Sequence, residues 1–237
     1  MPEKITFNKY QLRSPHYHWQ QISRNIFTFN AFVFARYQQV IKLIPHKKNQ
    51  KILDIGCGDG VLLSLINRGR LYGIDLDQSS LNYAATKVKA KFLKAPAELL
   101  PFQSGFFDVV IATEIIEHLD QPQKLLAEAN RVLKSGGRLI LTTPVKTSAG
   151  LTDRLHVQEF TSPELLLLCR RYFKRVKINC SHALWLRNIY TGSLGSLGHY
   201  HLEIGRWLIN SLVLLTGWNP FLNLLGHPVQ QLVEAQK

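Results

Sequence analysis

The clearest chemical signal in this sequence is the stretch Asp54-Ile55-Gly56-Cys57-Gly58-Asp59-Gly60. Glycines at alternating positions let a backbone turn sharply and approach a ligand closely, where a Cβ would obstruct it. A second carboxylate, Asp75, ends the next apolar run at a distance close to the ~20 residues that place an acid against ribose hydroxyls. The order of acid and glycines differs from the Gly-x-Gly-x-x-Gly of dinucleotide binders. It predicts a site for an adenosine ligand with an amino-acid tail.

Acids and histidines cluster in a second segment, residues 113–119, after a later apolar run. Glu114, Glu117 and His118 are spaced so that a helical turn would direct them toward one centre. His156 follows the next apolar run and can return to the same place, and either histidine can serve as a general base. The four side chains also suit a divalent metal. Helix capping and cofactor packing explain the Glu-His pair more simply, so no metal site is predicted.

Short apolar runs alternate with amphipathic stretches over most of the chain. The runs predict strands at 51–55, 71–75, 91–94, 107–112, 138–143, 173–180 and 230–236. Helices are predicted between them at 60–67, 78–87, 121–133 and 163–171, with Ser135-Gly136-Gly137 ending one and Ser162-Pro163-Glu164 starting another. The alternation predicts an α/β, Rossmann-like fold, a seven-stranded and mostly parallel sheet flanked by helices. Ligands of such sheets bind at the carboxyl ends of the strands.

Two segments lie outside this core, which we place at residues 47–181 with a final strand at 227–237. Residues 24–44 have one broad apolar face and predict a single amphipathic helix within an N-terminal cap, residues 1–46. Residues 182–226 form an apolar, aromatic insertion whose most apolar part, 207–218, is far shorter than the ~20 residues that span a bilayer. We expect cap and insertion to close over the acceptor as a lid. Peripheral membrane contact through 204–225 is a further hypothesis.

The chain is strongly basic, with 29 Lys and Arg against 16 Asp and Glu in 237 residues and a formal charge of +13. Such an excess favours anionic partners without choosing among them, and it equally suits a generally cationic surface. The three cysteines show no disulfide or zinc spacing, and the first residues lack the apolar core of a secretory signal. These features predict a cytoplasmic protein, with membrane association as a hypothesis. They leave the oligomeric state open.

Five segments resemble the class I S-adenosylmethionine-dependent methyltransferases of the small-molecule branch, in the expected order over about residues 50–180. They are ILDIGCGDG, GIDLD, AELLPF, FDVVIATEIIEHL and RVLKSGGRLILTTP. The ExxEH pattern also resembles the ubiquinone-pathway O-methyltransferases and, together with His156, the set of the small-RNA 3′-terminal 2′-O-methyltransferases. The resemblance implies S-adenosyl-L-methionine as the cofactor and S-adenosyl-L-homocysteine as the product.

The same resemblance implies roles for individual residues. The glycines of the loop would wrap the methionine moiety, and Asp54 would orient the loop or the amino group. Asp75 would bind the ribose hydroxyls. Ala97 would lie beside the adenine, although many relatives have an aspartate just before that alanine and this chain has Pro96. The full set of expected cofactor contacts is Asp54, Gly56, Cys57, Gly58, Gly60, Asp75, Leu76, Ala97, Glu98 and Thr113.

We therefore expect an enzyme that methylates a small, hydrophobic acceptor, with oxygen as the favoured acceptor atom. Methyl transfer is an in-line displacement, so the protein mainly aligns the acceptor and excludes water, and only a hydroxyl acceptor needs a base. Glu114, His118 and His156 are the expected catalytic residues. Two alternatives stay open. One is a metal-assisted RNA 2′-O-methyltransferase, with nucleic acid as the less favoured partner, and the other is a cofactor-binding subunit without catalysis of its own.

Overall fold

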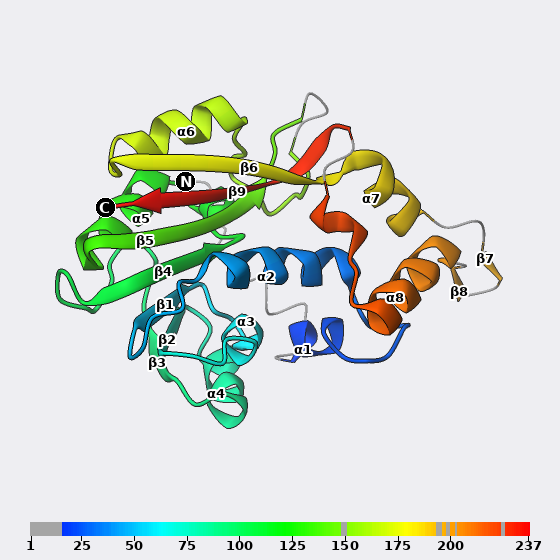
Figure 1. The fold of residues 1–237 in the computed structure, drawn as a ribbon, viewed down its shortest axis with the longest axis horizontal. Coiled ribbons are helices and arrows are strands. Elements are labelled where there is room, and N and C mark those ends of the chain that lie inside the picture. The colour runs from blue at the N-terminus through cyan, green and yellow to red at the C-terminus, as the bar shows by residue number, and fades with distance from the viewer. Residues whose placement is uncertain (1–15, 148–150, 193–195, 198–199, 202, 224–225) are drawn as a thin grey trace, which may run out of the picture.

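The fold was analysed in a computed structural model that describes residues 16–147, 151–192, 196–197, 200–201, 203–223 and 226–237. Its centre is a sheet of seven strands in the order β3-β2-β1-β4-β5-β9-β6 (Figure 1). In this sheet β9 runs antiparallel to both of its neighbours, and the other pairs are parallel. The predicted α/β, mostly parallel sheet is confirmed. The strands are β1 (Lys51–Ile55), β2 (Arg70–Asp75), β3 (Lys91–Lys94), β4 (Phe107–Thr113), β5 (Leu133–Pro144), β6 (Arg175–Ala183) and β9 (Pro228–Gln236).

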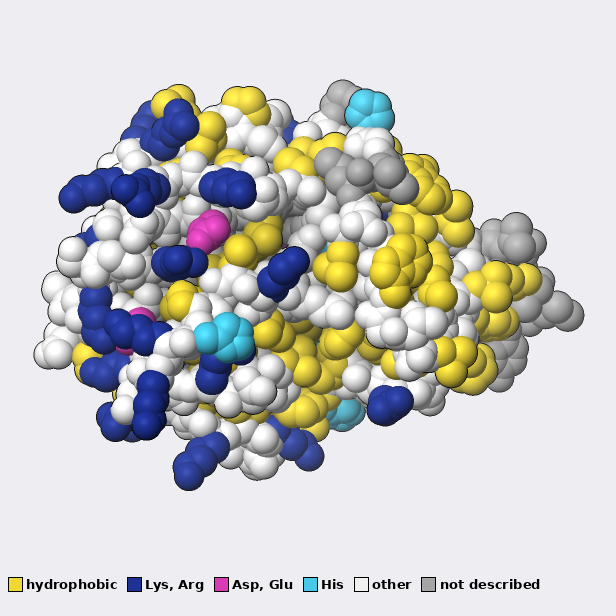
Figure 2. All heavy atoms as spheres, viewed as in Figure 1, with side chains coloured by type: hydrophobic (Ala, Val, Ile, Leu, Met, Phe, Trp, Pro, Cys, Tyr) yellow, Lys and Arg dark blue, Asp and Glu magenta, His cyan; other side chains and the backbone are white. Residues whose placement is uncertain are grey.

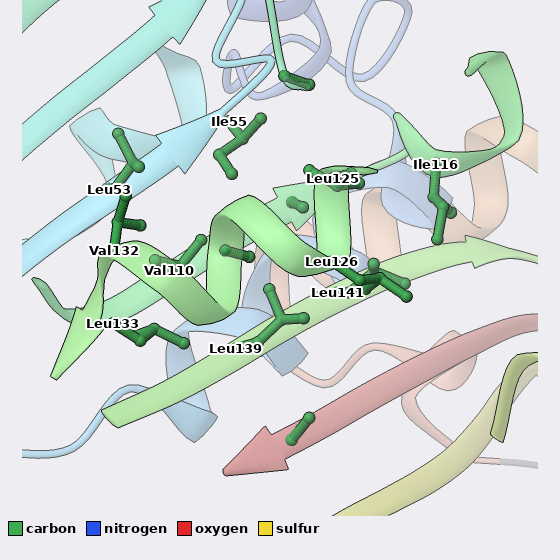
Figure 3. Close-up of a cluster of buried hydrophobic side chains, with 14 of the residues drawn as sticks. Leu53, Ile55, Val110, Ile116, Leu125, Leu126, Val132, Leu133, Leu139 and Leu141 are labelled. Atoms are coloured by element: carbon green, nitrogen blue, oxygen red, sulfur yellow. The ribbon is translucent and has the colours of Figure 1, made fainter. Parts of the chain in front are cut away.

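Helices cover both faces of the sheet, which explains why its central strands are apolar throughout. Successive side chains of a strand point to opposite faces. Leu53 and Val110 accordingly pack with α5 (Pro122–Val132) and α6 (Ser162–Arg170). Ile52 and Val109 pack on the other face with α2 (Ala31–Leu43), α3 (Val61–Ser64) and α4 (Gln78–Lys87). Figure 3 shows Leu125, Leu126 and Val132 of α5 lying over β4 and β5 in the first of these layers.

The end of α5 differs from the expectation. The helix stops at Val132, and β5 begins at Leu133, so Ser135-Gly136-Gly137 lies inside the strand and does not end the helix. The backbone of Leu133 is already extended and pairs with Phe107. The register then shifts before the next pair, Val109 with Arg138, and Gly136 within the shift has a φ of 73°. The glycines therefore allow the irregularity in β5 and do not mark the end of the helix.

The expectation of one N-terminal helix over 24–44 is wrong. The structure has a short α1 (Tyr17–Gln21), then turns, and starts α2 only at Ala31. The Asn25 side chain accepts a hydrogen bond from Phe27 N at 2.9 Å, which stabilises the turn. Asn30 then caps α2 by accepting from Val33 N at 3.1 Å. Two asparagines therefore interrupt the apolar pattern that suggested one continuous helix.

A third group of buried side chains joins the N-terminal part of α2 to three elements of the insertion. These are α7 (Leu184–Thr191), α8 (Ile204–Thr216) and the 3-10 turn η2 (Pro220–Leu222). Between α7 and α8 lies a short hairpin, β7 (Ser196–Leu197) and β8 (Tyr200–His201). We call residues 29–35, 183–191 and 204–222 the cap lobe, which lies beside one end of the sheet (Figure 1). No helix among the described residues is long and apolar enough to cross a membrane.

Candidate active site

A glycine-rich turn joins β1 to α3 at the carboxyl edge of the sheet. Gly56, Gly58 and Gly60 have φ angles of 72°, 50° and 77°, in the left-handed region that favours glycine. A Cβ on Gly56 would lie 2.6 Å from Ile115 Cδ1, so space also restricts this position. A Cβ on Gly60 would lie 2.9 Å from Ala84 Cβ on α4, which indicates a packing role for that glycine. The turn presents backbone rather than side chains to the space above the sheet.

Asp75 ends β2 beside this turn. Its Oδ2 accepts a hydrogen bond from Gly58 N at 2.8 Å, and its Oδ1 accepts one from Asp77 N at 2.9 Å. Burial raises the pKa of the Asp75 carboxyl, although these N–H donors act in the opposite direction. Asp75 lines a cavity of about 510 Å³. Gly56, Leu76, Ala97 and Glu98, all predicted from the sequence as cofactor contacts, line the same cavity.

A second cavity, of about 340 Å³, adjoins the first. The two linings have Gly56, Glu114 and His118 in common. The other sequence-predicted residues in the wall of this second cavity are Asp54, Cys57, Gly58, Thr113, Glu117 and His156. Gly60 belongs to neither lining. Two spaces therefore meet beside the glycine-rich turn, at the edge where ligands of open α/β sheets bind.

Comparison with known proteins identifies the kind of domain that contains this site. Residues 53–141 match the family described as "Methyltransferase domain". The chain contains a class I, S-adenosylmethionine-dependent methyltransferase domain. A solved S-adenosylmethionine-dependent methyltransferase from Archaeoglobus fulgidus has a similar fold, with a TM-score of 0.62 and 20% identity over 94% of this chain and 99% of that one.

Two curated relatives are similar in sequence to part of this chain. The ubiquinone biosynthesis O-methyltransferase of Xanthomonas oryzae pv. oryzae is 29% identical over 146 residues, which cover 58% of this chain and 61% of that one. The malonyl-[acyl-carrier protein] O-methyltransferase of Hahella chejuensis is 32% identical over 130 residues, 48% of this chain and 47% of that one. This chain thus spans less than two thirds of the length of either relative.

The residues of the methyltransferase domain fit an S-adenosylmethionine-type ligand. Asp54 is 1% exposed and lines the second cavity, and its Oδ1 has no hydrogen-bond partner among the described residues. Burial, followed by the nearby charge of Asp75, raises the pKa of Asp54 well above its usual range. A buried carboxylate with an unsatisfied oxygen is costly unless a donor or cation reaches it. The ammonium group of a methionine moiety would supply both.

Glu117, His118 and His156 come together at the acceptor side of the domain, and each offers a potential ligand atom within 4.8 Å of the others. His118 belongs to the 3-10 turn η1 (Ile116–His118) that follows β4. Its Nδ1 lies 3.0 Å from Leu155 O, and Nδ1 of His156 lies 2.6 Å from Glu159 Oε1. Because these oxygens accept hydrogen bonds, each Nδ1 carries a proton, and Nε2 is the basic nitrogen of each neutral ring. The cluster suits proton abstraction or a divalent ion.

Glu114 does not join this cluster, although the sequence grouped the four side chains. Its carboxylate lies 3.2 Å from Arg36 Nη2 and accepts hydrogen bonds from Thr142 Oγ1 and Gln230 Nε2, at 3.0 and 2.8 Å. The helical turn starts only at Ile116, and Glu114 has a φ of 52°. This left-handed backbone places Glu114 ahead of the turn, so the predicted helical spacing to His118 does not apply. Glu114 still lines both cavities.

Three residues of the site were not anticipated from the sequence. Arg36 on α2 and Arg187 on α7 line the second cavity, and Arg187 makes no ion pair within the described part of the chain. Asp59 binds α1 to the glycine-rich turn, since its Oδ2 accepts from His18 N at 3.0 Å and its carbonyl accepts from Trp19 Nε1 at 2.9 Å. Asp59 stood inside a recognised motif and could have been proposed. The two arginines lie on helices whose local sequence contains no motif that would indicate a site.

Proposed function

We propose that this protein transfers the methyl group of S-adenosyl-L-methionine to a hydroxyl oxygen of a small, hydrophobic acceptor. The observation that carries the proposal is the shared wall of the two cavities at Gly56, Glu114 and His118. The larger cavity, with Asp75 at its base, suits the adenosine part of the cofactor. The adjoining cavity contains Asp54 and the basic histidines, so it suits the methionine end and the acceptor. The two reactants would meet at the shared wall.

The chain's own residues would contribute alignment, exclusion of water and one proton transfer. The bound cofactor supplies an electrophilic methyl group on a sulfonium sulfur, and the acceptor oxygen displaces that sulfur in line. His118 would take the acceptor's proton at Nε2, with the ring held by its Nδ1–H bond to Leu155 O. His156 would assist from the neighbouring ring, 4.9 Å away between centroids. Glu114, held by Arg36, would keep a negative charge beside the cationic reaction centre.

Part of the remaining wall is apolar and supports a hydrophobic acceptor, whereas Arg36, Arg187 and Gln230 make other parts of the wall polar. Phe32 and Val33 of α2, Pro144 at the end of β5 and Val229 of β9 line the acceptor cavity. In the proposal, the cap (1–46) and the insertion (182–226) serve as a lid over the catalytic core (47–181, completed by 227–237). The three cysteines are free thiols, which agrees with the cytoplasmic location that we propose. Contact with a membrane surface is a separate proposal that does not rest on methyl transfer.

A divalent ion is a second candidate for activating the acceptor. Glu117, His118 and His156 would hold it, and their donor set of one carboxylate and two imidazoles fits such an ion. The ion would lower the pKa of the acceptor hydroxyl. Turnover that survives a chelator and does not respond to added Mg²⁺ or Mn²⁺ would leave the histidine as the base. An RNA acceptor would instead show binding that weakens steeply with salt.

Calorimetry with S-adenosyl-L-homocysteine tests the cofactor site. Asp75→Ala is expected to weaken binding by roughly 10- to 100-fold, because a charged hydrogen-bond acceptor is lost. Gly58→Val should do the same, since a β-branched residue does not tolerate the φ of 50°. Glu234→Ala removes an acid that pairs with Arg138 on the sheet and serves as the control. Unchanged affinity in both site variants would refute the assignment.

A methyl-label screen then addresses the acceptor. One purified chain is incubated with labelled cofactor and fractionated lipids, metabolites or RNA, and incorporation is followed in each fraction. Label in a small hydrophobic product supports the proposal. Label confined to RNA favours the alternative acceptor. Cofactor binding without incorporation in any fraction favours a cofactor-binding subunit.

A further inference from the structure

The cap lobe exposes large apolar side chains to an unusual extent. The exposed residues are Trp185 and Ile189 on α7, Ile204, Leu208, Leu212 and Leu215 on α8, and Trp218 and Leu222 after it. We call this set the apolar face. Leu215 is 85% exposed and Leu208 is 67% exposed. Figure 2 shows hydrophobic atoms gathered over α7 and α8, whereas the lysines and arginines of this view lie mainly over the sheet. Contiguous exposed apolar surface on this scale marks an interaction site.

The apolar face is held in place by a rigid framework, so its exposure does not come from loose packing. The opposite side of α8 carries Asn210 and Val213, which are buried against the rest of the lobe. Leu208, Leu212 and Leu215 follow one another four and three positions apart, on the side of the helix that faces solvent. A Cβ on Gly205 would collide with the carbonyl oxygen of Ile189, so α8 starts in direct contact with α7. The two helices present their apolar side chains as one surface.

The charges of the lobe indicate what kind of partner covers this face. The cap lobe contains two basic residues, Arg187 and Arg206, and no acid, since Glu203 lies just before α8. Glu203 pairs with Arg206, which leaves Arg187 as the cation of the lobe without an acidic partner in the described part of the chain. A lobe that has no acid and two exposed tryptophans complements an anionic lipid surface, where indole rings lie at the headgroup level.

One helix, α7, contributes residues to both the apolar face and the acceptor cavity. Arg187 of α7 lines that cavity, and Trp185 and Ile189 of the same helix belong to the apolar face. We propose that the apolar face docks on an anionic phospholipid bilayer and holds the acceptor cavity next to the lipid surface. Docking is peripheral, since the 13 residues of α8 extend about 20 Å, less than the ~30 Å hydrocarbon core. The delivery of a hydrophobic acceptor from the bilayer rests on the proposed function, whereas docking does not.

Flotation with vesicles tests docking without any need for catalysis. The probes are vesicles of phosphatidylcholine alone and of phosphatidylcholine with phosphatidylglycerol. The wild-type chain is expected to float with the anionic vesicles and to bind them at least tenfold more weakly after the double substitution Leu208→Asp and Leu215→Asp. Leu167→Asp, on α6, replaces a leucine that is 62% exposed outside the lobe and should leave flotation unchanged. Thermal unfolding and S-adenosyl-L-homocysteine affinity of each variant report whether the fold and the cofactor site remain intact.

Three results would overturn the proposal. The first is an equal soluble fraction of wild type with and without anionic vesicles. The second is equal loss of vesicle binding in Leu167→Asp, which would indicate nonspecific adhesion. The third is a wild-type dimer in analytical ultracentrifugation that the double substitution dissociates, with no vesicle binding, since a second copy would then cover the face. A chain that floats but does not bind S-adenosyl-L-homocysteine would refute the proposed function and leave docking in place.

Discussion

At the scale of single residues, a substitution of His118 can distinguish proton transfer from cofactor binding. Its Nδ1 is engaged by Leu155 O, and it lines both cavities where they meet. We predict that His118→Ala lowers kcat by roughly 100- to 10,000-fold with a hydroxyl acceptor, the usual contribution of a general base. The affinity for S-adenosyl-L-homocysteine, measured by calorimetry, should change little. A variant that loses cofactor affinity in proportion to turnover would place His118 in cofactor binding instead.

A second residue-scale prediction concerns His182, which is fully buried where β6 meets the cap lobe. Its Nε2 lies 2.9 Å from Phe32 O, and its ring stacks on Phe221. Burial lowers the pKa of His182 from 6.5 to about 4, although the Phe32 carbonyl acts in the opposite direction, as does the nearby charge of Glu114. Between these two pH values the unfolded chain binds a proton that the folded chain rejects. Acidification therefore lowers the free energy of unfolding, and the contribution is complete above about pH 6.5.

Urea unfolding at pH 7 and pH 5 measures this effect. Over this interval the free energy of unfolding of the wild type should fall by about 2 kcal/mol more than that of His182→Asn. The figure is about 1.36 kcal/mol per pH unit, taken over the roughly 1.5 units between pH 6.5 and pH 5. Asparagine is the suitable replacement because His182 has a φ of 61°, which asparagine adopts more readily than most residues. Comparing how the free energy of unfolding changes with pH in the two proteins removes the contribution of the carboxylates, because these titrate in both. Equal slopes would show that His182 does not reject the proton.

At the scale of elements, α8 is tied to the N-terminal segment by one buried side chain. Asn210 Nδ2 donates to Ile26 O and Phe29 O, both at 2.8 Å, and its Oδ1 accepts from Tyr190 OH at 2.8 Å. We predict that Asn210→Ala lowers the free energy of unfolding by about 2–4 kcal/mol, because buried acceptors lose their donor. Asn188→Ala, at an exposed position of α7, is the matched control. Chemical denaturation measures both, and equal losses would remove the special role of Asn210.

The same elements show what the sequence could and could not predict. The sheet and its ligand edge were predictable because alternation and the glycine-rich turn are local signals around Asp54 and Asp75. The split between α1 and α2 depends on the side-chain bonds of Asn25 and Asn30, which compete with an apolar pattern that continues through them. The ion pair of Arg36 with Glu114 joins elements that are far apart in the chain, so no sequence spacing could predict it.

At the scale of the whole molecule, the core and helix α1 are coupled through the glycine-rich turn. Asp59 within the glycine-rich turn receives hydrogen bonds from His18 N and Trp19 Nε1, so α1 is attached to the backbone that would bind the methionine moiety. Tyr17 and His18 also line the acceptor cavity. A ligand that orders this turn should therefore order α1 as well, because the two share these bonds. The coupling would close the site after the cofactor is bound.

Hydrogen exchange with and without S-adenosyl-L-homocysteine measures this coupling. We predict slower exchange in residues 16–21 when the ligand is bound, together with slower exchange in the glycine-rich turn, and no change in α6, which packs on the opposite face of the sheet. Trp19→Phe removes the indole donor to Asp59 and keeps an aromatic ring beside Tyr83. It should retain protection of the turn while losing much of the protection of α1. Ligand-induced protection of the turn alone in the wild type would show that α1 does not respond to the cofactor.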